Sequence, residues 1–237
     1  MFTESFRVRY ADLGPDAYVR PTAILEYLQE IATDHSGEVG YDLYRMRSEY
    51  MGWAILCWDV RLGRPIRWAE KLTARTWPYS FSGAIGKRRL ELWSENEELL
   101  VQADSWWALI DLRTHQTRNI PPEMKEAFRT DGEAPFHLRR PRGKASEQLG
   151  EYPVREMDFD TNGHVNNIRF AEMAFSALPP AEPGKISEFM VEYKRQGMRG
   201  DRIMPARSLE EGGAYVELAN PEGLVFVKLQ VLQETQS

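Results

Sequence analysis

The stretch "DFDTNGHVNNIRF", residues 158–170, crowds two aspartates, two further polar side chains and a histidine into seven residues, directly before an apolar helical pattern begins. A helix N-terminus supplies backbone N–H groups and a positive partial charge. Carboxylate, amide and imidazole groups beside such a terminus can bind water or a developing oxyanion, and Gly163 permits a backbone turn that other residues resist. The stretch therefore predicts a polar turn that leads into a helix over residues 165–178.

The same arrangement occurs once more, near the start of the chain. Pro21 suits the first turn of a helix, and the apolar residues that follow it predict a helix over residues 22–36 with one apolar face. Seven-residue spacings are shared by Asp12, Val19 and Glu26 and by Asp158, Val165 and Glu172, at an offset of 146 (158 − 12). Together with the common order of elements, this spacing indicates an internal duplication.

Each predicted helix is followed by runs rich in Trp, Leu, Val and Ile that read as antiparallel strands separated by turn signals. Residues 131–150 are rich in Gly, Pro and charge and read as a linker over the surface. A helix with one apolar face must bury it, and the sheet is the large apolar surface available. We therefore expect an α+β fold with an N-terminal domain over 1–130, a linker over 131–150 and a C-terminal domain over 151–237.

Composition excludes several classes of function. The net charge of −6 argues against a nucleic-acid binder, which is usually basic. Cys57 is the single cysteine, so neither an internal disulfide nor a cysteine-based metal cluster is possible, and we expect it to be buried in a strand. No apolar run approaches the ~20 residues of a membrane span, and the first ten residues lack the apolar core of a signal peptide, so a cytoplasmic protein is expected.

Several ordered motifs resemble a known family. The stretch at 158–167 is similar to the D-x-D-x-x-G-H-V-N-N signature of hotdog-fold thioesterases, and the similarity to fatty acyl-ACP thioesterases covers nearly the whole chain. It is carried by "AILEYLQEIA", "SGAIGKRRLELW", "DLRTHQTRNIPPEM" and "VEYKRQG". The resemblance implies two tandem hotdog domains, each an antiparallel sheet wrapped around a central helix. It also implies hydrolysis of fatty acyl-ACP to free fatty acid, which terminates or diverts fatty-acid synthesis, with no cofactor and no metal.

The resemblance assigns roles within the polar turn. Asp160, Asn162 and His164 match the residues implicated in catalysis: Asn and His orient the carbonyl and water, and Asp supports the network. Asp158, the first Asp of the signature, is expected to hold the loop. The remaining two asparagines of the stretch are expected to cap the helix.

Gln196 is a departure from the family, which usually has a glutamate at this position on the strand after the helix. An amide can hold a water but cannot accept its proton at neutral pH. Glu192 is the nearest acid along the strand, about 13 Å away in an extended chain, so Asp160 is the best remaining base. Three possibilities stay open: a slow enzyme, an enzyme based on Asp160, and a protein that binds acyl thioesters with little turnover. An acyl-CoA thioesterase on the same fold is a further alternative.

The expected partner is acyl carrier protein, whose strong negative charge calls for a basic docking face. Two basic runs are candidates, residues 87–89 and 139–144, although strand alternation places Arg88 on the face opposite Lys87 and Arg89. The first half lacks the signature, with Tyr18 where the second half has His164, so the resemblance implies that it holds the acyl-chain pocket. Tryptophans that are candidates for shaping that pocket are Trp53, Trp58, Trp77, Trp106 and Trp107. A homodimer is possible.

Overall fold

The chain divides into two units, the first formed by residues 1–56 and 60–138 and the second by residues 57–59 and 139–237. The computed structural model describes residues 1–160, 163–182 and 184–233. The elements of the first unit are β1 (Phe2–Arg7), a 3-10 turn at Tyr10–Asp12, α1 (Pro21–Glu38), α2 (Leu43–Ser48), β2 (Met51–Leu62), β3 (Lys71–Ser82), β4 (Ile85–Ser94), β5 (Leu99–Asp111), β6 (Gln116–Thr117) and α3 (Pro122–Phe128).

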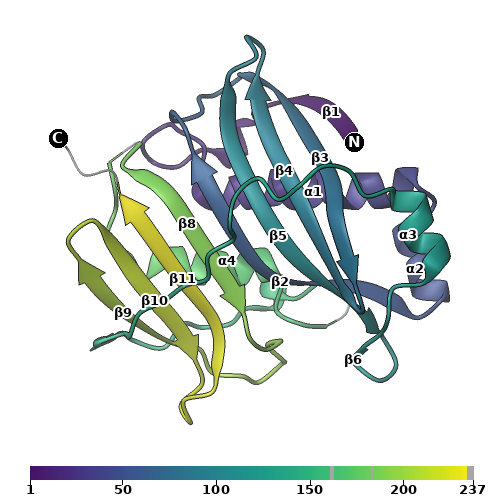
Figure 1. Ribbon diagram of the computed structural model, residues 1–237. Coiled ribbons are helices and arrows are strands. Elements are labelled where there is room, and N and C mark those ends of the chain that lie inside the picture. Colours follow the sequence, from purple (N-terminus) through teal and green to yellow (C-terminus); the bar gives the residue numbers. More distant parts are fainter. Residues whose placement is uncertain (161–162, 183, 234–237) are drawn as a thin grey trace. The chain divides into compact units, whose positions relative to one another are not determined.

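The first unit is an antiparallel sheet with a long helix on one face. Its strands follow the order β1-β3-β4-β5-β2, and β6 pairs with β5. Helix α1 packs on this sheet against β1 and β3, as Figure 1 shows. Pro21 begins α1 as predicted, and its apolar side chains, such as Leu25 and Leu28, are fully buried. Gly40, with φ of 83°, supplies the left-handed residue that ends the helical segment.

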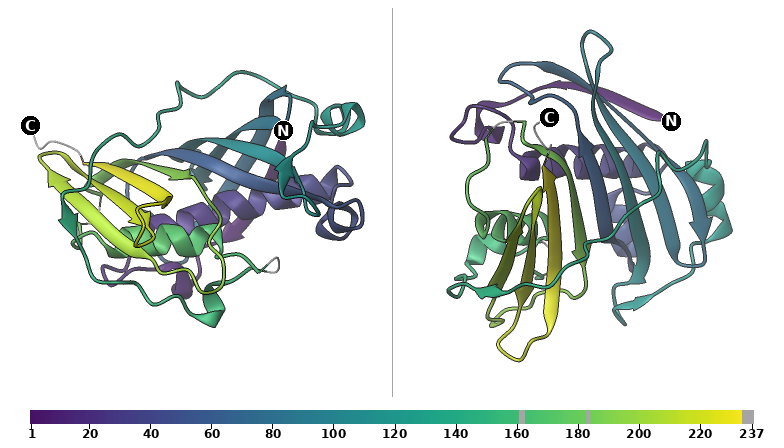
Figure 2. Two further views of the ribbon diagram at one scale, coloured as in Figure 1. Left: turned by 90° about the horizontal axis from the view of Figure 1, so that it is seen from below. Right: turned by 60° about the vertical axis from the view of Figure 1, so that its left-hand side comes forward.

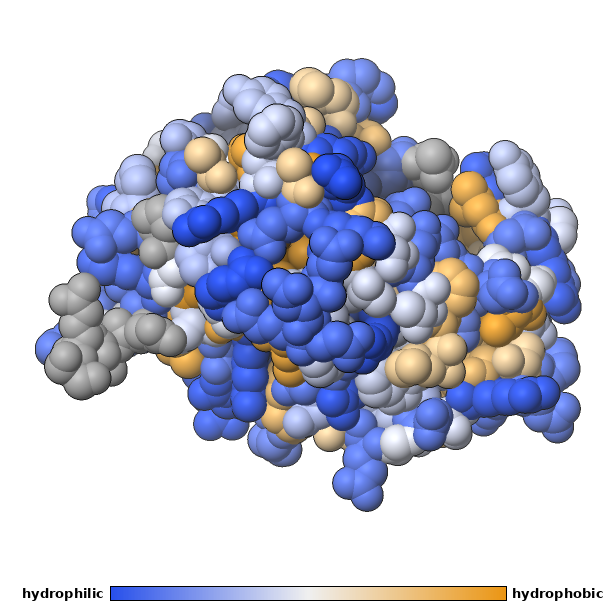
Figure 3. Space-filling model, turned by 90° about the horizontal axis from the view of Figure 1, so that it is seen from above, coloured by the Kyte–Doolittle hydropathy of each residue, from blue (hydrophilic) through white to orange (hydrophobic). Residues whose placement is uncertain are grey.

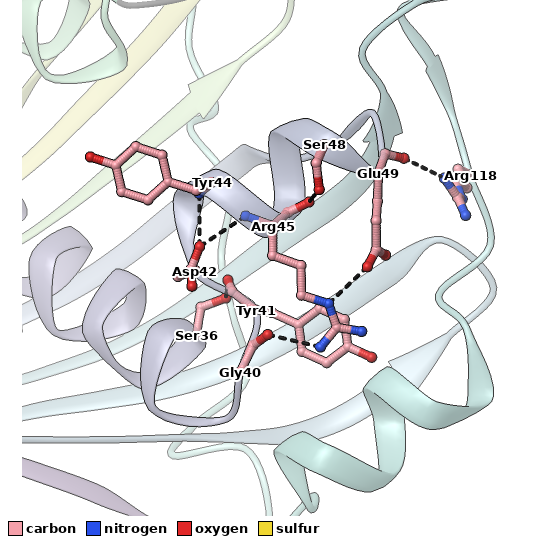
Figure 4. Close-up of polar contacts among 9 residues, drawn as sticks. All are labelled: Ser36, Gly40, Tyr41, Asp42, Tyr44, Arg45, Ser48, Glu49 and Arg118. Carbon is pink, nitrogen blue, oxygen red and sulfur yellow. Dashed lines mark hydrogen bonds and ion pairs between the residues drawn. The ribbon is translucent and has the colours of Figure 1, made fainter.

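The chain beyond α1 turns back through α2, which is fixed by a dense set of polar contacts (Figure 4). Asp42 caps α2 by accepting hydrogen bonds from the backbone N–H groups of Tyr44 and Arg45, at 2.8 and 2.9 Å. The guanidinium of Arg45 lies over the ring of Tyr41 and donates to the carbonyl of Gly40 at 2.8 Å. These contacts place Tyr41 in an apolar cluster with Met46, Met51, Leu109, Ile120, Met124 and Phe128.

The second unit repeats the plan on a smaller scale. Its elements are β7 (Glu147–Gln148), a 3-10 turn at Glu156–Asp158, α4 (Asn167–Ser176), β8 (Ile186–Tyr193), β9 (Met204–Glu210), β10 (Gly213–Ala219) and β11 (Val225–Gln233). The strands pair antiparallel in the order β8-β11-β10-β9-β7. Helix α4 contacts β10 and β11 (Figure 2), and Phe170 on the helix stacks on Phe226 of β11 at 5.7 Å.

Several predicted boundaries differ from the observed ones for local reasons. The predicted helix over 165–178 is shorter, because the N–H of Val165 is bonded to the carbonyl of Gly197 and Asn166 is the N-cap. Strand β1 ends at Arg7, since the chain then enters the turn at Asp12. The segment predicted as a linker contains strand β7 near its end.

Several side chains of both basic runs have partners in the structure, while Arg142 and Lys144 of the second run are exposed, so docking of a carrier on either run stays a prediction. Arg88 is buried inside the first unit, while Lys87 lies over the ring of Trp106, 4.1 Å from its centroid. Arg89 is paired with Glu91. In the second run Arg139 pairs with Glu188, and Arg140 pairs with Glu192 at 3.1 Å.

Figure 3 shows one face of the molecule, on which hydrophilic residues predominate and hydrophobic ones form small groups.

Cys57, the single cysteine, is buried, as expected, and Trp58 beside it is fully buried, whereas the other candidate tryptophans are half-buried. No helix in the described ranges is long and apolar enough to cross a membrane. Within the same ranges, no group of three or more His, Cys, Asp or Glu side chains is arranged to hold a metal ion.

Candidate active site

The polar turn of the second unit is closed by backbone and side-chain hydrogen bonds between its two ends. The N–H of Asp160 donates to the carbonyl of His164 at 2.8 Å, and the N–H of His164 donates back to Oδ1 of Asp160 at 3.0 Å. Between them Gly163 has φ of 78°, a conformation that favours glycine, and its N–H donates to the carbonyl of Asp160 at 3.1 Å. Asp160 and His164 are therefore held together at the neck of one tight turn.

Asp158 holds this turn in place through hydrogen bonds, as the sequence predicted. Its side chain is buried, with 1% exposure, and accepts a hydrogen bond from the N–H of Arg155 at 2.7 Å. The carbonyl of Asp158 accepts from the N–H of Asn166 at 2.8 Å. The side chain of Asn166 caps α4 by accepting from the N–H of Ile168 at 2.8 Å, so its predicted role as a cap is confirmed.

His164 lies three residues before the first residue of α4 and is 9% exposed. The helix begins at Asn167, so the positive partial charge of its first turn lies on the same short segment as the imidazole. Asn162, the third predicted residue of the turn, lies outside the described residues.

Gln196 lies in the segment that follows β8, and not on the strand itself as predicted, because β8 ends at Tyr193. The neighbouring Gly197 accepts a hydrogen bond from the N–H of Val165 at 2.9 Å, which brings this segment alongside the polar turn. A Cβ atom at Gly197 would lie 2.6 Å from Cζ of Phe170, so glycine is required for this approach. Gln196 itself is exposed to solvent.

Glu192 is not a substitute for the missing glutamate. Its carboxylate is buried and forms ion pairs with Arg140 at 3.1 Å and with Lys194 at 3.0 Å. Because these two cations hold it, Glu192 belongs to a structural network on β8. The sequence prediction that it does not replace the base is consistent with this pairing.

Tyr193 is a residue near the site that sequence reasoning missed. Its hydroxyl donates to the carbonyl of Asn167 at 3.0 Å, and burial raises the pKa of this phenol well above its ordinary value. It therefore acts as a neutral hydrogen-bond donor that ties β8 to the first residue of α4. The sequence signal was a tyrosine at the end of an apolar strand, a position that favours an amphipathic side chain.

The equivalent turn of the first unit has the same backbone hydrogen bonds. The N–H of Gly14 donates to the carbonyl of Tyr18 at 2.7 Å, and the N–H of Arg20 donates to the carbonyl of Asp12 at 3.1 Å. Ala17 has φ of 65°, at the position equivalent to the glycine of the second turn. This turn places a glycine and a tyrosine where the second turn has the aspartate and the histidine, so only the second turn offers an acid–imidazole pair.

Two family models match the chain. One, described as the acyl-ACP thioesterase N-terminal domain, matches residues 1–128, and the other, described as the acyl-ACP thioesterase C-terminal domain, matches residues 142–221. The dodecanoyl-[acyl-carrier-protein] hydrolase of Umbellularia californica is 25% identical over 233 residues, which cover 90% of this chain and 60% of that protein. The palmitoyl-acyl carrier protein thioesterase of Gossypium hirsutum is 25% identical over 220 residues, covering 83% and 52%. The chain thus spans little more than half the length of these chloroplastic relatives.

Solved structures agree on the fold. A 12:0-ACP thioesterase from Umbellularia californica matches with a TM-score of 0.86 and 21% identity over 99% of this chain and 97% of that one. An acyl-ACP thioesterase from Bacteroides thetaiotaomicron matches with a TM-score of 0.86 and 19% identity, covering 98% and 97%. A DHNA-CoA thioesterase from Staphylococcus aureus matches 53% of the chain with a TM-score of 0.50 and 17% identity. The predicted α+β fold of two tandem hotdog domains is confirmed.

Proposed function

Since the chain belongs to the acyl-ACP thioesterase family, we propose that it hydrolyses the thioester of fatty acyl-ACP and releases free fatty acid. The observation that carries this proposal is the closed turn of the second unit, which fixes Asp160 against His164 at the start of α4. Release of the acid removes the growing chain from its carrier, so the reaction terminates or diverts fatty-acid synthesis.

The proposed mechanism makes Asp160 the general base. Water attacks the thioester carbonyl carbon, its proton passes to the carboxylate, and the carrier thiol leaves with a proton as the C–S bond breaks. A carboxylate has about four acceptor sites on its two oxygens, and Oδ1 of Asp160 accepts the N–H of His164, which fixes the carboxylate in the turn. His164 and Asn162 are proposed to orient the carbonyl oxygen and the water, as the family signature implies.

Gln196 is proposed to hold the attacking water without taking its proton. Its place next to Gly197, whose carbonyl is bonded to the turn, supports this role. The missing glutamate also supports the alternative that the protein binds acyl thioesters with little turnover. An acyl-CoA thioesterase is a second alternative, because one structure that shares the fold is of a protein named for a CoA thioester.

We assign the acyl chain to the first unit, because its turn lacks the acid–imidazole pair and its interior contains a cluster of buried apolar side chains. A cytoplasmic location and a possible homodimer remain parts of the proposal that rest on sequence alone. The location is open to cell fractionation, and the oligomeric state to light scattering on the purified protein.

The decisive test is a hydrolysis screen of purified wild-type protein on C4–C18 acyl-ACPs and the matching acyl-CoAs, with product acids measured by mass spectrometry. We expect turnover on acyl-ACP and its loss in Asp160→Asn. Faster turnover on the CoA series would favour the acyl-CoA alternative. Tight binding of acyl-ACP with no released acid at any chain length would show a binding protein instead.

A further inference from the structure

Arg88 is a buried cation inside the first unit. It lies on β4, on the face of the sheet that α1 covers, and only 7% of its surface is exposed. Its Nη1 donates to Nδ1 of His35 at 2.9 Å and to Oγ1 of Thr76 at 3.0 Å. Among the described residues, no carboxylate forms an ion pair with this guanidinium, whereas other buried charges, such as Glu91 and Glu192, are paired with a cation.

The two polar side chains bonded to Arg88 are neutral acceptors for its Nη1, so neither of them balances the charge of the guanidinium. Because arginine only donates, Nδ1 of His35 is the acceptor, which places the imidazole proton on Nε2. Burial, together with the charge of Arg88, lowers the pKa of His35 to about 3, so this ring is neutral at ordinary pH. The hydroxyl of Thr76 accepts from Arg88 and donates to the carbonyl of Arg89 at 3.1 Å. Among the described residues, the side-chain hydrogen bonds of Arg88 both come from Nη1, and that of His35 is made through Nδ1.

Aromatic rings surround this donor cluster. Phe2 stacks on His35 with ring centroids 5.5 Å apart, and Phe128 meets the same ring edge-on at 5.4 Å. The guanidinium of Arg88 lies 5.5 Å from the ring centroid of Phe128, which also stacks on Tyr41. Burying a charge among apolar side chains costs free energy of folding unless hydrogen-bond acceptors or an anion compensate it. The cluster is therefore suited to an acceptor that a ligand brings.

We propose that Arg88 and His35 form a subsite for an oxygen-bearing group on the acyl chain, remote from the thioester. The ligand class is an acyl thioester whose chain carries a hydroxyl, keto or carboxylate oxygen, in preference to a fully saturated hydrocarbon chain. This inference rests on the proposed function in one respect, the assignment of the acyl chain to the first unit. An oxygen acceptor would complete the hydrogen bonds of the guanidinium and the imidazole, which a terminal methyl group cannot do.

The test compares paired ligands of equal length, from C8 to C16, with a terminal methyl, hydroxyl or carboxylate group. Non-hydrolysable thioether analogues on a pantetheine arm are titrated by calorimetry, and the thioesters are assayed for turnover on ACP. We expect wild type to bind at least one oxygen-bearing series about 10- to 100-fold more tightly than the methyl series. The hydroxyl and carboxylate arms decide which oxygen group the subsite prefers.

Arg88→Met removes the charge at similar length and should erase this preference, while Arg88→Lys should retain part of it. The matched control is Lys87→Met on the opposite face of the same strand, whose ammonium lies over Trp106, and it should leave the preference unchanged. Equal binding of methyl and oxygen-bearing analogues by wild type overturns the proposal without any variant. A preference that survives in Arg88→Met also overturns it, and a change in melting temperature alone would then assign Arg88 to the fold. Absence of turnover with a retained binding preference would reject hydrolysis and leave this subsite standing.

Discussion

The turn before α1 and the turn before α4 have the same backbone hydrogen bonds but different side chains. In both, a buried aspartate accepts a hydrogen bond from the N–H three residues earlier, Asp12 from Arg9 at 3.0 Å and Asp158 from Arg155 at 2.7 Å. In both, an Asp Oδ1 accepts a hydrogen bond from a backbone N–H at the end of the turn: Asp16 accepts from Tyr18 at 3.1 Å, and Asp160 accepts from His164 at 3.0 Å.

The two turns differ in the side chains at equivalent positions of the turn and of the helix that follows it. The second turn has an imidazole where the first has a phenol, and its helix begins after an asparagine cap rather than at Pro21. The first turn is tied to its helix by Tyr27, whose hydroxyl donates to Asp12 at 2.5 Å, whereas the equivalent position of α4 is Met173. The comparison teaches that the fold preserves the backbone of the turn, while a few side chains decide whether it supports chemistry.

Asp160→Asn should produce the largest effect. The amide oxygen can still accept the N–H of His164, so the turn should keep its shape while the general base is lost. We expect hydrolysis of the best acyl-ACP to fall by about 10²- to 10⁴-fold. The matched control is Asp16→Asn in the first turn, which should leave turnover close to wild type. Wild-type activity in Asp160→Asn would show that the proposed mechanism is wrong.

His164→Ala should come next, with turnover reduced about 10²-fold if the imidazole helps to hold the oxyanion or the water. Tyr18→Ala at the equivalent position should change turnover only a few-fold, because we assign no chemistry to the first turn. Both are read from steady-state kinetics, with circular dichroism to verify folding. Equal losses in the two variants would remove the functional distinction between the turns.

Tyr27→Phe tests the structural side of the comparison. Burial by itself would raise the pKa of Asp12, but hydrogen bonds from Arg9 and Tyr27 outweigh it and hold this pKa below its ordinary value. The ionised form of Asp12 therefore stabilises the fold above about pH 4, and this contribution is lost as the pH falls through the lowered folded-state pKa. We expect Tyr27→Phe to reduce the free energy of unfolding by about 1–2 kcal/mol at pH 7.

Urea titrations at pH 7 and pH 3 measure this effect, and the cost of Tyr27→Phe should shrink at the lower pH. Met173→Leu in α4, at the position equivalent to Tyr27, is the control and should show the same small cost at both values of pH. A cost of Tyr27→Phe that does not change with pH would mean that the hydroxyl does not act through the charge of Asp12.

Gln196→Ala should have the smallest effect, a loss of turnover below about tenfold, because the residue holds a water and the proton goes to Asp160. The side chain is exposed, so stability should change by no more than about 0.5 kcal/mol. Gln196→Glu should alter the pH–rate profile, since a second carboxylate near Asp160 would raise one of the two pKa values. A binding protein would show the opposite pattern, with no wild-type turnover and a gain in Gln196→Glu.

The duplication, the two helices, the antiparallel sheets and the polar turn could all be predicted from the amino-acid sequence. These features depend on local rules, since apolar periodicity, Pro21 at a helix start and the signature at 158–167 act over short distances along the chain. The same signature, through its resemblance to a family, pointed to Asp160 and His164, and the structure joins their backbones in one turn.

Tertiary structure alone decided how the charged side chains are used. Alternation along β4 predicted that Arg88 faces away from its neighbours, yet only the packing of α1 shows that this face is buried and that His35 and Thr76 meet the guanidinium there. The partners of the second basic run, Glu188 and Glu192, lie about 50 residues further along the chain. Pairings of this kind depend on how distant segments fold together, because a side chain finds its hydrogen-bond partner in space and not in the order of the sequence.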